Sequence, residues 1–191
     1  MLQAARTRSA FQKVKFLGAG LLHDFKAPHD AIRLDDGSLL VNELGAKSLV
    51  RVSGEHGKDR AVVVGDLAGP VGLVGGPKGS VYLTEAFSGQ VSKVESNGEK
   101  TVIAKDLKMP EGIALSGDGQ LIVAEVGGRR IIQIDPQDGK VTEIAANLPI
   151  GLPGAPGTLP TNIPTGVGVG ASGTIYFSSD IENAIYKITK K

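Results

Sequence analysis

The sequence predicts an all-β fold built from four similar units, and three observations carry this prediction. Glycine accounts for 27 of 191 residues, about twice its usual share of roughly 7%. Apolar residues make up 41% of the chain and aromatic residues only 4%. A 25-residue pattern occurs four times without a gap. Short strands joined by tight turns explain the composition, and a repeat architecture explains the pattern.

The four copies each begin with a proline and share a glycine at the tenth position. They read PHDAIRLDDGSLLVNELGAKSLVRV, PVGLVGGPKGSVYLTEAFSGQVSKV, PEGIALSGDGQLIVAEVGGRRIIQI and PTGVGVGASGTIYFSSDIENAIYKI. Their first residues are Pro28, Pro70, Pro110 and Pro164, and the shared glycines are Gly37, Gly79, Gly119 and Gly173. Agreement over so many columns indicates one structural unit that is repeated.

Each copy predicts three strands. An inner run such as 112–115 leads into a turn with glycine, which is a hairpin signal between apolar runs. The second run, such as 121–123, is apolar on both faces, and the third alternates apolar and polar residues. A fourth strand ending in leucine follows the first three copies, at residues 60–67, 100–107 and 140–148. The fourth copy has no such run after it.

The strand that the fourth copy lacks is expected from residues 11–21, which have the pattern of the other fourth strands. Four-stranded sheets of about 40 residues arranged radially are the blades of a β-propeller. We therefore predict one β-propeller domain over residues 1–191, with four-stranded blades at about 28–67, 70–107, 110–148 and 164–191, closed by strand 11–21. The alternatives are a partial propeller that completes a larger ring by oligomerisation and a Gly-rich β-sandwich.

The repeat unit P-x-G-[IVL]-[AG]-x-x-x-x-G-x-[LIV]-[YIL]-[VLF]-x-[ED] resembles the NHL repeat. It also resembles the propellers of gluconolactonases, senescence-marker-protein-like lactonases and strictosidine-synthase-like proteins, over about residues 11–188. The resemblance implies a lactonase-, hydrolase- or lyase-like site, or a non-catalytic interaction propeller of the NHL type. Members of these families usually have six blades, whereas this sequence has four copies, so a four-bladed ring and a ring completed by a partner chain both stay open.

Strand order places the candidate functional residues at one rim of the ring. The inner strands begin at this rim, called the proline rim, and the repeat glycines turn at the opposite one, called the glycine rim. The residues that follow the prolines face the channel, where propellers bind ligands; they are His29, Val71, Glu111 and Thr165. In the resembling lactonases, Glu, Asn and Asp ligate a metal at this position. The resemblance thus makes Glu111 and Asp30 candidate ligands of a divalent cation such as calcium, with a structural role as the alternative for Glu111.

Glu111, His29 and Asp30 are also the candidate catalytic residues, because the imidazole of His29 suits proton transfer near neutrality. A small-molecule ligand is expected at the same rim. Its candidate contacts are polar residues that interrupt or adjoin repeated positions: Asn42, Thr84, Thr165, Ser178, Ser179 and Asp180. Glu43, Glu85 and Glu125 share one column. We expect them to hydrogen-bond backbone amides between blades, since an architectural role predicts repetition.

Residues 149–163, PIGLPGAPGTLPTNI, form an unusually long connection with four prolines and three glycines. Connections of this length are often lids or binding loops. We expect this one at the proline rim, either over the channel or against a partner chain in a homo-oligomer.

Composition excludes several classes of partner. The 21 basic and 20 acidic residues leave no electrostatic footprint for nucleic acid. No apolar run approaches the roughly 18 residues of a membrane-spanning helix, so no membrane partner is expected. The absence of cysteine excludes a disulfide framework and a cysteine nucleophile. The first residues lack the apolar core of a signal peptide, but a mature secreted chain would lack it too, so a cytoplasmic chain and a secreted mature form both stay open.

Overall fold

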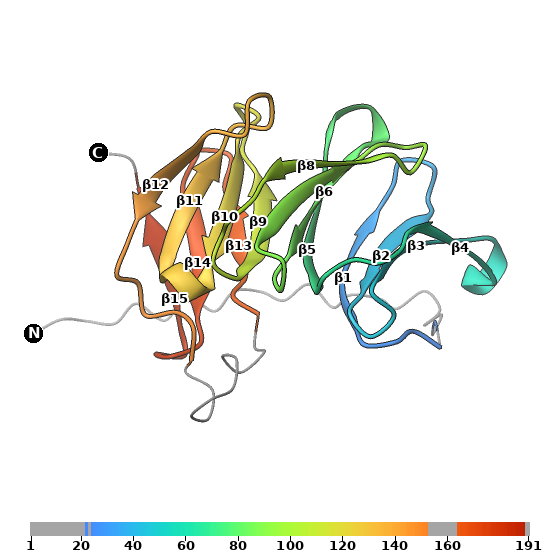
Figure 1. Ribbon diagram of the computed structural model, residues 1–191, viewed down its shortest axis with the longest axis horizontal. Helices are drawn as coiled ribbons and strands as arrows, with labels where there is room; N and C mark the ends of the chain where they lie inside the picture. The colour runs from blue at the N-terminus through green and yellow to red at the C-terminus, as the bar shows by residue number, and fades with distance from the viewer. Residues whose placement is uncertain (1–21, 23, 153–163, 190–191) are drawn as a thin grey trace, which may run out of the picture.

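The computed structural model describes residues 22, 24–152 and 164–189, which form fifteen strands in four antiparallel sheets (Figure 1). The first sheet contains β1 (Pro28–Arg33), β2 (Leu39–Glu43), β3 (Ser48–Ser53) and β4 (Asp59–Val64). The second contains β5 (Pro70–Gly75), β6 (Val81–Glu85), β7 (Gln90–Val94) and β8 (Lys100–Ala104). The third contains β9 (Pro110–Leu115), β10 (Leu121–Glu125), β11 (Arg130–Ile134) and β12 (Val141–Ala145). The fourth contains β13 (Val167–Val169), β14 (Ile175–Ser179) and β15 (Ala184–Ile188).

Short one-turn 3-10 helices lie in three connections, at η1 (Glu55–Gly57), η2 (Pro77–Gly79) and η3 (Val126–Gly128). Within each sheet the strands pair in chain order. The first three sheets begin at the repeat prolines Pro28, Pro70 and Pro110, and the fourth begins three residues after Pro164. No helix in the described part of the chain is long and apolar enough to cross a membrane.

The repeated glycines have two different structural reasons. Those at the tenth position turn the inner strand into the second strand with φ between 76° and 86°, a conformation that glycine adopts without strain. Two of those at the third position, Gly72 and Gly112, let neighbouring inner strands approach closely. A Cβ on Gly72 would lie 2.4 Å from the carbonyl oxygen of Glu111, and one on Gly112 would lie 2.3 Å from that of Thr165.

The hydrophobic core lies between neighbouring sheets rather than at one centre. We call the contact of the first and second sheets the first junction, that of the second and third the second junction, and that of the third and fourth the third junction. Leu49, Leu83 and Val94 are buried in the first junction. Leu121, Ile132 and Ile134 are buried in the second, and Ile131, Ile150 and Phe177 in the third. Full burial of each such side chain is worth about 1.5–3 kcal/mol.

The inner strands lie side by side in the order β1, β5, β9, β13. Figure 1 shows the first and fourth sheets at opposite ends of the long axis. No hydrogen bond within the described ranges joins these two sheets, and the fourth sheet has three strands there. Residues 11–21 lie outside the described residues, so closure of the ring by this segment remains a prediction, as does completion by a partner.

The connection that enters the first sheet has the same backbone features as the connections that enter the other sheets. A left-handed Asp or Asn precedes each sheet, with φ of 66° at Asp24, 55° at Asp66, 62° at Asp106 and 55° at Asn147. The amides of Leu44, Ala86 and Val126 then bond to the carbonyls of Ala27, Gly69 and Met109. Residues 24–28 therefore connect to β1 as the connections between blades do, which is what the predicted closure requires of them.

Candidate functional site

The repeated glutamates at the ends of β2, β6 and β10 are structural. Each carboxylate accepts a hydrogen bond from the backbone amide 17 residues earlier in the chain. The donors are Lys26 N for Glu43 at 2.8 Å, Ala68 N for Glu85 at 3.0 Å and Lys108 N for Glu125 at 2.7 Å. These bonds tie the connection before each inner strand to the second strand of the same sheet. The expectation that the glutamates bond backbone amides is confirmed, but these bonds join each sheet to its own incoming connection and not to the neighbouring sheet. We call the three residues the glutamate latches.

The surroundings of Glu85 explain why the carboxylate of this latch residue stays ionised. Burial by itself raises the pKa of Glu85, but hydrogen bonds from Lys100, the Ala68 amide and Ser92 outweigh it and hold the pKa below its ordinary value. The Lys100 ammonium lies 2.5 Å from Oε1 of Glu85. This carboxylate is a bound anion, not a proton donor or acceptor at neutral pH.

The fourth copy replaces the glutamate with Ser179, whose neighbour Asp180 holds the start of the long connection. Ser179 Oγ donates to the carbonyl of Pro149. Asp180 accepts bonds from the amides of Gly151 at 2.9 Å and Leu152 at 2.7 Å. Ile150, between these contacts, is fully buried in the third junction. The first residues of the connection are thus built into the fold, whereas residues 153–163, and with them the expected lid, lie outside the described residues.

Asn42, Thr84 and Ser178 occupy one column and bond the backbone of inner strands. Asn42 Nδ2 donates to the carbonyl of Gly72 at 3.1 Å. Thr84 Oγ1 accepts from the Gly72 amide at 2.8 Å and donates to the carbonyl of Glu111 at 2.7 Å. Ser178 Oγ accepts from the Gly166 amide at 2.8 Å. Of the candidate ligand contacts in this column, only Asn42 retains a buried atom without a partner, its Oδ1.

Asp30 connects the first two inner strands. One of its carboxylate oxygens accepts from the amide of Ala31 at 2.8 Å and the other from that of Leu73 at 2.9 Å. Calcium takes six to eight oxygen ligands. Within residues 24–152 and 164–189, no group of three or more His, Asp or Glu side chains could hold a metal ion. The described residues thus show no such cluster at the proline rim, the divalent cation stays a prediction, and no metal-dependent step is derived.

Glu111, the second residue of β9, differs chemically from the other acidic residues. Its side chain is 1% exposed, and Oε2 accepts a hydrogen bond from the Thr165 amide at 2.7 Å. Burial raises the pKa of Glu111 to about 7, a hydrogen bond from Thr165 lowers it, and the negative charge of Asp180 raises it further. The hydroxyl of Thr165 is buried without a hydrogen-bond partner. A titratable carboxyl and an unpaired hydroxyl thus lie together at the proline rim.

His29, the third candidate catalytic residue, is half-buried near the start of β1. The strand β5 lies between β1 and β9. The inner strand β5 therefore lies between Glu111 and the pair His29 and Asp30, and Asp30 is already engaged by backbone amides. Of the three catalytic candidates, Glu111 is the one with a buried carboxyl whose pKa is raised to about 7.

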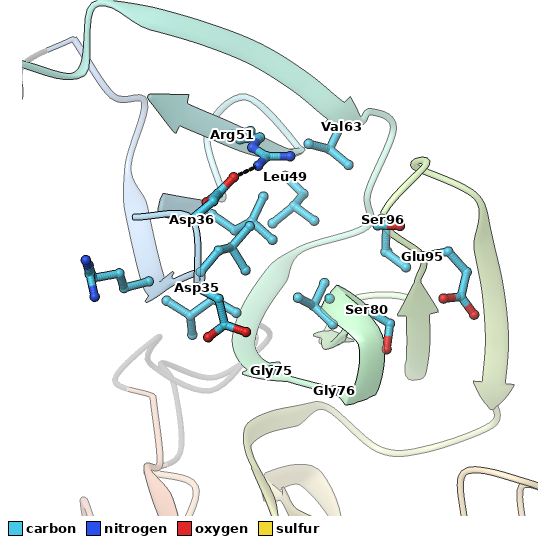
Figure 2. Close-up of a pocket in the computed structure, with 17 residues that line it drawn as sticks. Asp35, Asp36, Leu49, Arg51, Val63, Gly75, Gly76, Ser80, Glu95 and Ser96 are labelled. Carbon is cyan, nitrogen blue, oxygen red and sulfur yellow. Dashed lines mark hydrogen bonds and ion pairs between the residues drawn. The ribbon is translucent and has the colours of Figure 1, made fainter. Parts of the chain in front are cut away.

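A cavity at the opposite, glycine rim was not predicted from the sequence. A cavity of about 540 Å³ lies between the first and second sheets, and Figure 2 shows Asp35, Asp36 and Arg51 on the side of the first sheet with Gly75, Gly76 and Ser80 on the second. A similar cavity of about 460 Å³ lies in the third junction. The signal was present in the repeat alignment, because Gly75 occupies a position at which the other copies carry Arg33, Leu115 and Val169.

Comparison with known proteins rests on structure alone, because no family model and no curated protein matches the sequence. Virginiamycin B lyase from Staphylococcus aureus superimposes with a TM-score of 0.65 at 19% identity, over 85% of this chain and 52% of the lyase. A nidogen/laminin complex gives 0.71 at 18%, over 87% and 60% of the two chains. The chain is a β-propeller.

A structure described as a proposed gluconolactonase agrees, with a TM-score of 0.64 at 18% identity over 85% of this chain and 60% of the other. At such identities the similarity shows the fold alone. It confirms the propeller and its likeness to gluconolactonase and NHL-type propellers. The described chain spans about half to three-fifths of the length of these structures.

Proposed function

We propose that this propeller binds a small organic molecule at the proline rim and transfers a proton with Glu111, as in a hydrolase or a lyase. The observation that carries the proposal is the buried Glu111 carboxyl with a pKa of about 7. General acids and bases work best when their pKa lies near the operating pH. The proposal is supported by the lyase and the proposed gluconolactonase among the structures that share this fold.

The chemistry available to Glu111 is one proton transfer in each direction. In hydrolysis of an ester or lactone, the carboxylate takes a proton from water as the water oxygen bonds to the carbonyl carbon, and the proton then passes to the leaving alkoxide. In elimination, it takes a proton from carbon as the adjacent carbon–oxygen bond breaks. The unpaired Thr165 hydroxyl is a hydrogen-bond partner for a polar group of the substrate. Because Glu111 is buried, this rim must open for the substrate.

A panel of lactones, esters and esters with an acidic proton β to the leaving oxygen tests the proposal. Glu111→Gln should reduce kcat/KM by about 10²–10⁴-fold on any substrate that is turned over. Glu99→Gln, at an exposed glutamate in the turn between β7 and β8, is the matched control and should leave turnover unchanged. Incorporation of oxygen from labelled water distinguishes hydrolysis from elimination. Equal kcat/KM in the wild type and in Glu111→Gln would refute the assignment of Glu111.

Calcium is the cofactor that the family resemblance implies, and thermal unfolding tests it directly. A metal that binds only the folded chain must raise Tm at excess concentration. Because both oxygens of Asp30 are engaged and no ligand group of three occurs in the described part, we expect millimolar calcium to leave Tm unchanged. An increase in Tm with calcium that is absent in Glu111→Gln would show instead that calcium binds at Glu111.

A non-catalytic interaction propeller of the NHL type is the second candidate. It is supported by the nidogen/laminin complex among the similar structures. It also accounts for the rim residues Asp30, Thr84 and Ser178, whose polar atoms bond backbone groups. This candidate predicts no turnover of the panel, with or without Glu111.

A further inference from the structure

The cavity at the glycine rim of the first junction is a candidate ligand site separate from Glu111. The strand β5 runs from Pro70 at the proline rim to Gly75 at the glycine rim. The cavity residues on this strand are at its end, whereas Glu111 lies at the beginning of β9. We propose that this cavity binds a cationic amphiphile, a short alkyl chain or ring that carries an ammonium group.

The cavity exists because two repeat positions carry smaller side chains in the first junction than in the second. At the second junction, Tyr82 from β6 and Leu115 from β9 belong to one apolar cluster. The same two positions at the first junction are Leu40 and Gly75. A Cβ added to Gly75 would meet no atom within 4 Å. The missing side chains leave the space that the second junction fills.

The floor of the cavity is apolar and built from buried core side chains. It is lined by side chains of the first-junction core, which are Ile32, Leu34, Leu40, Leu49, Val63, Val81 and Val94. Leu49 and Val94 are at most 1% exposed, and Leu40 is 5% exposed. The volume of about 540 Å³ falls in the range of roughly 300–1,000 Å³ that is usual for small-molecule sites. An apolar tail is therefore the part of a ligand that this floor would bury.

The charges at the mouth favour a cationic head group. Arg51 pairs with Asp36, and Figure 2 shows this contact at the edge of the cavity. Hydrogen bonds from Ser38 and the charge of Arg51 hold the pKa of Asp36 below its ordinary value, so it stays ionised and neutralises Arg51. On the second sheet, Lys93 neutralises Glu95 at 2.6 Å.

Asp35 and Arg33 are the remaining charged residues that line the cavity. Side chains alternate between the faces of a strand. Ile32 packs in the first junction, so the side chain of Arg33 leaves the opposite face of β1. Its guanidinium lies beside the turn, 3.6 Å from the position of a Cβ on Gly37. The carboxylate of Asp35 is thus the surplus charge at the mouth.

Binding is tested with octylammonium, octanoate and octanol as probes of the same chain length and different charge. Methyl NMR of the full chain reports contact with Ile32, Leu40 and Val81 directly. We expect saturable shifts of these methyls with octylammonium, at least threefold weaker affinity for octanol and weaker affinity still for octanoate. Tighter binding of octanoate than of octylammonium would overturn the proposal.

Gly75→Leu tests the cavity itself, because it introduces the side chain that Leu115 has at the equivalent position. Filling the floor should weaken octylammonium binding by at least about tenfold, since the tail loses several buried methylene contacts. Gly65→Leu is the matched control, because Gly65 also has open space around its Cβ position but does not line the cavity. Leu40→Tyr, which reproduces Tyr82, replaces Gly75→Leu if the latter does not fold.

Asp35→Asn tests the head group. It should weaken octylammonium binding by about two- to fivefold, the effect of an exposed ion pair, and leave octanol binding unchanged. If octylammonium keeps its affinity in both Gly75→Leu and Leu40→Tyr, the probe binds elsewhere and the cavity assignment is wrong. If Asp35→Asn weakens octylammonium and octanol equally, the role of charge is refuted. Neither result depends on Glu111, because all probes are followed by binding.

Discussion

The first and second junctions share a backbone plan but differ in how completely they are filled. At the proline rim, Asn42 bonds the Gly72 carbonyl across the first junction, and Thr84 bonds the Glu111 carbonyl across the second. At the glycine rim, Tyr82 and Leu115 pack together in the second junction, whereas a cavity of about 540 Å³ opens in the first. These hydrogen bonds across the junctions come from Asn42 and Thr84, which occupy a column of the repeat whose residue differs between copies. Side chains that differ between copies at two repeat positions, Leu40 against Tyr82 and Gly75 against Leu115, decide whether the space between the sheets is available to a ligand.

The largest expected effect comes from making the second junction resemble the first. Tyr82→Leu combined with Leu115→Gly removes the side chains that fill it and should lower the free energy of unfolding by roughly 3–5 kcal/mol, from lost burial and the new cavity. Urea denaturation measures the loss. Tyr176→Leu is the control, because Tyr176 occupies the same repeat position as Tyr82 but is 42% exposed. An equal loss in the control would mean that the effect does not come from the junction.

Glu111 provides the next effect, and it depends on pH. Because its pKa in the folded chain is about 7 instead of the usual 4.5, the unfolded chain loses this proton first as the pH rises. Stability contributed by the neutral carboxyl is fully present below pH 4.5 and declines until the pH passes about 7. Glu111→Gln should therefore stabilise the protein at pH 8 by at most about 3 kcal/mol and change little at pH 4.

Thermal or urea unfolding across this pH range checks the prediction for Glu111. The control Glu99→Gln should show no such pH dependence. A difference between Glu111→Gln and the wild type that stays constant from pH 4 to pH 8 would show that folding does not shift the pKa of Glu111.

Removing a glutamate latch should have a smaller effect. Glu85→Ala leaves the Ala68 amide and the Lys100 ammonium without their acceptor and should cost roughly 2 kcal/mol. The pKa of Glu85 is lowered in the folded chain, so this contribution is present above the ordinary pKa of a glutamate and is lost as the pH falls through the lowered value. Chemical denaturation at neutral and acidic pH should show the difference between Glu85→Ala and the wild type shrinking in acid.

The smallest effect is expected from making the first junction resemble the second. Gly75→Leu adds an apolar side chain where a Cβ has open space, and it should raise the free energy of unfolding by about 1 kcal/mol. Gly65→Leu, which lies outside the cavity, should give no such gain. Destabilisation by Gly75→Leu alone would mean that the space cannot accept a leucine.

The repeats predicted the structural residues that recur from copy to copy, but not the contacts that single residues make with other strands. The repeat columns predicted the strands, the turn glycines and the structural role of Glu43, Glu85 and Glu125, because the same backbone geometry recurs in each copy. The left-handed Asp66, Asp106 and Asn147 form another such column that sequence analysis overlooked. By contrast, the backbone partners of Asp30, Thr84 and Ser178 could not be predicted, since they depend on distances between strands that are far apart in the sequence.

By itself, the sequence determined an all-β propeller of repeated sheets, because proline, glycine and glutamate at regular positions are local requirements of turns, close strand contacts and latches. Only the tertiary structure decided what the exceptional positions do. Glu111 titrates near neutrality because burial removes it from water, and the cavity at Gly75 opens because a side chain is missing where two sheets meet. Desolvation and packing are properties of what surrounds a residue, and those surroundings come from other sheets.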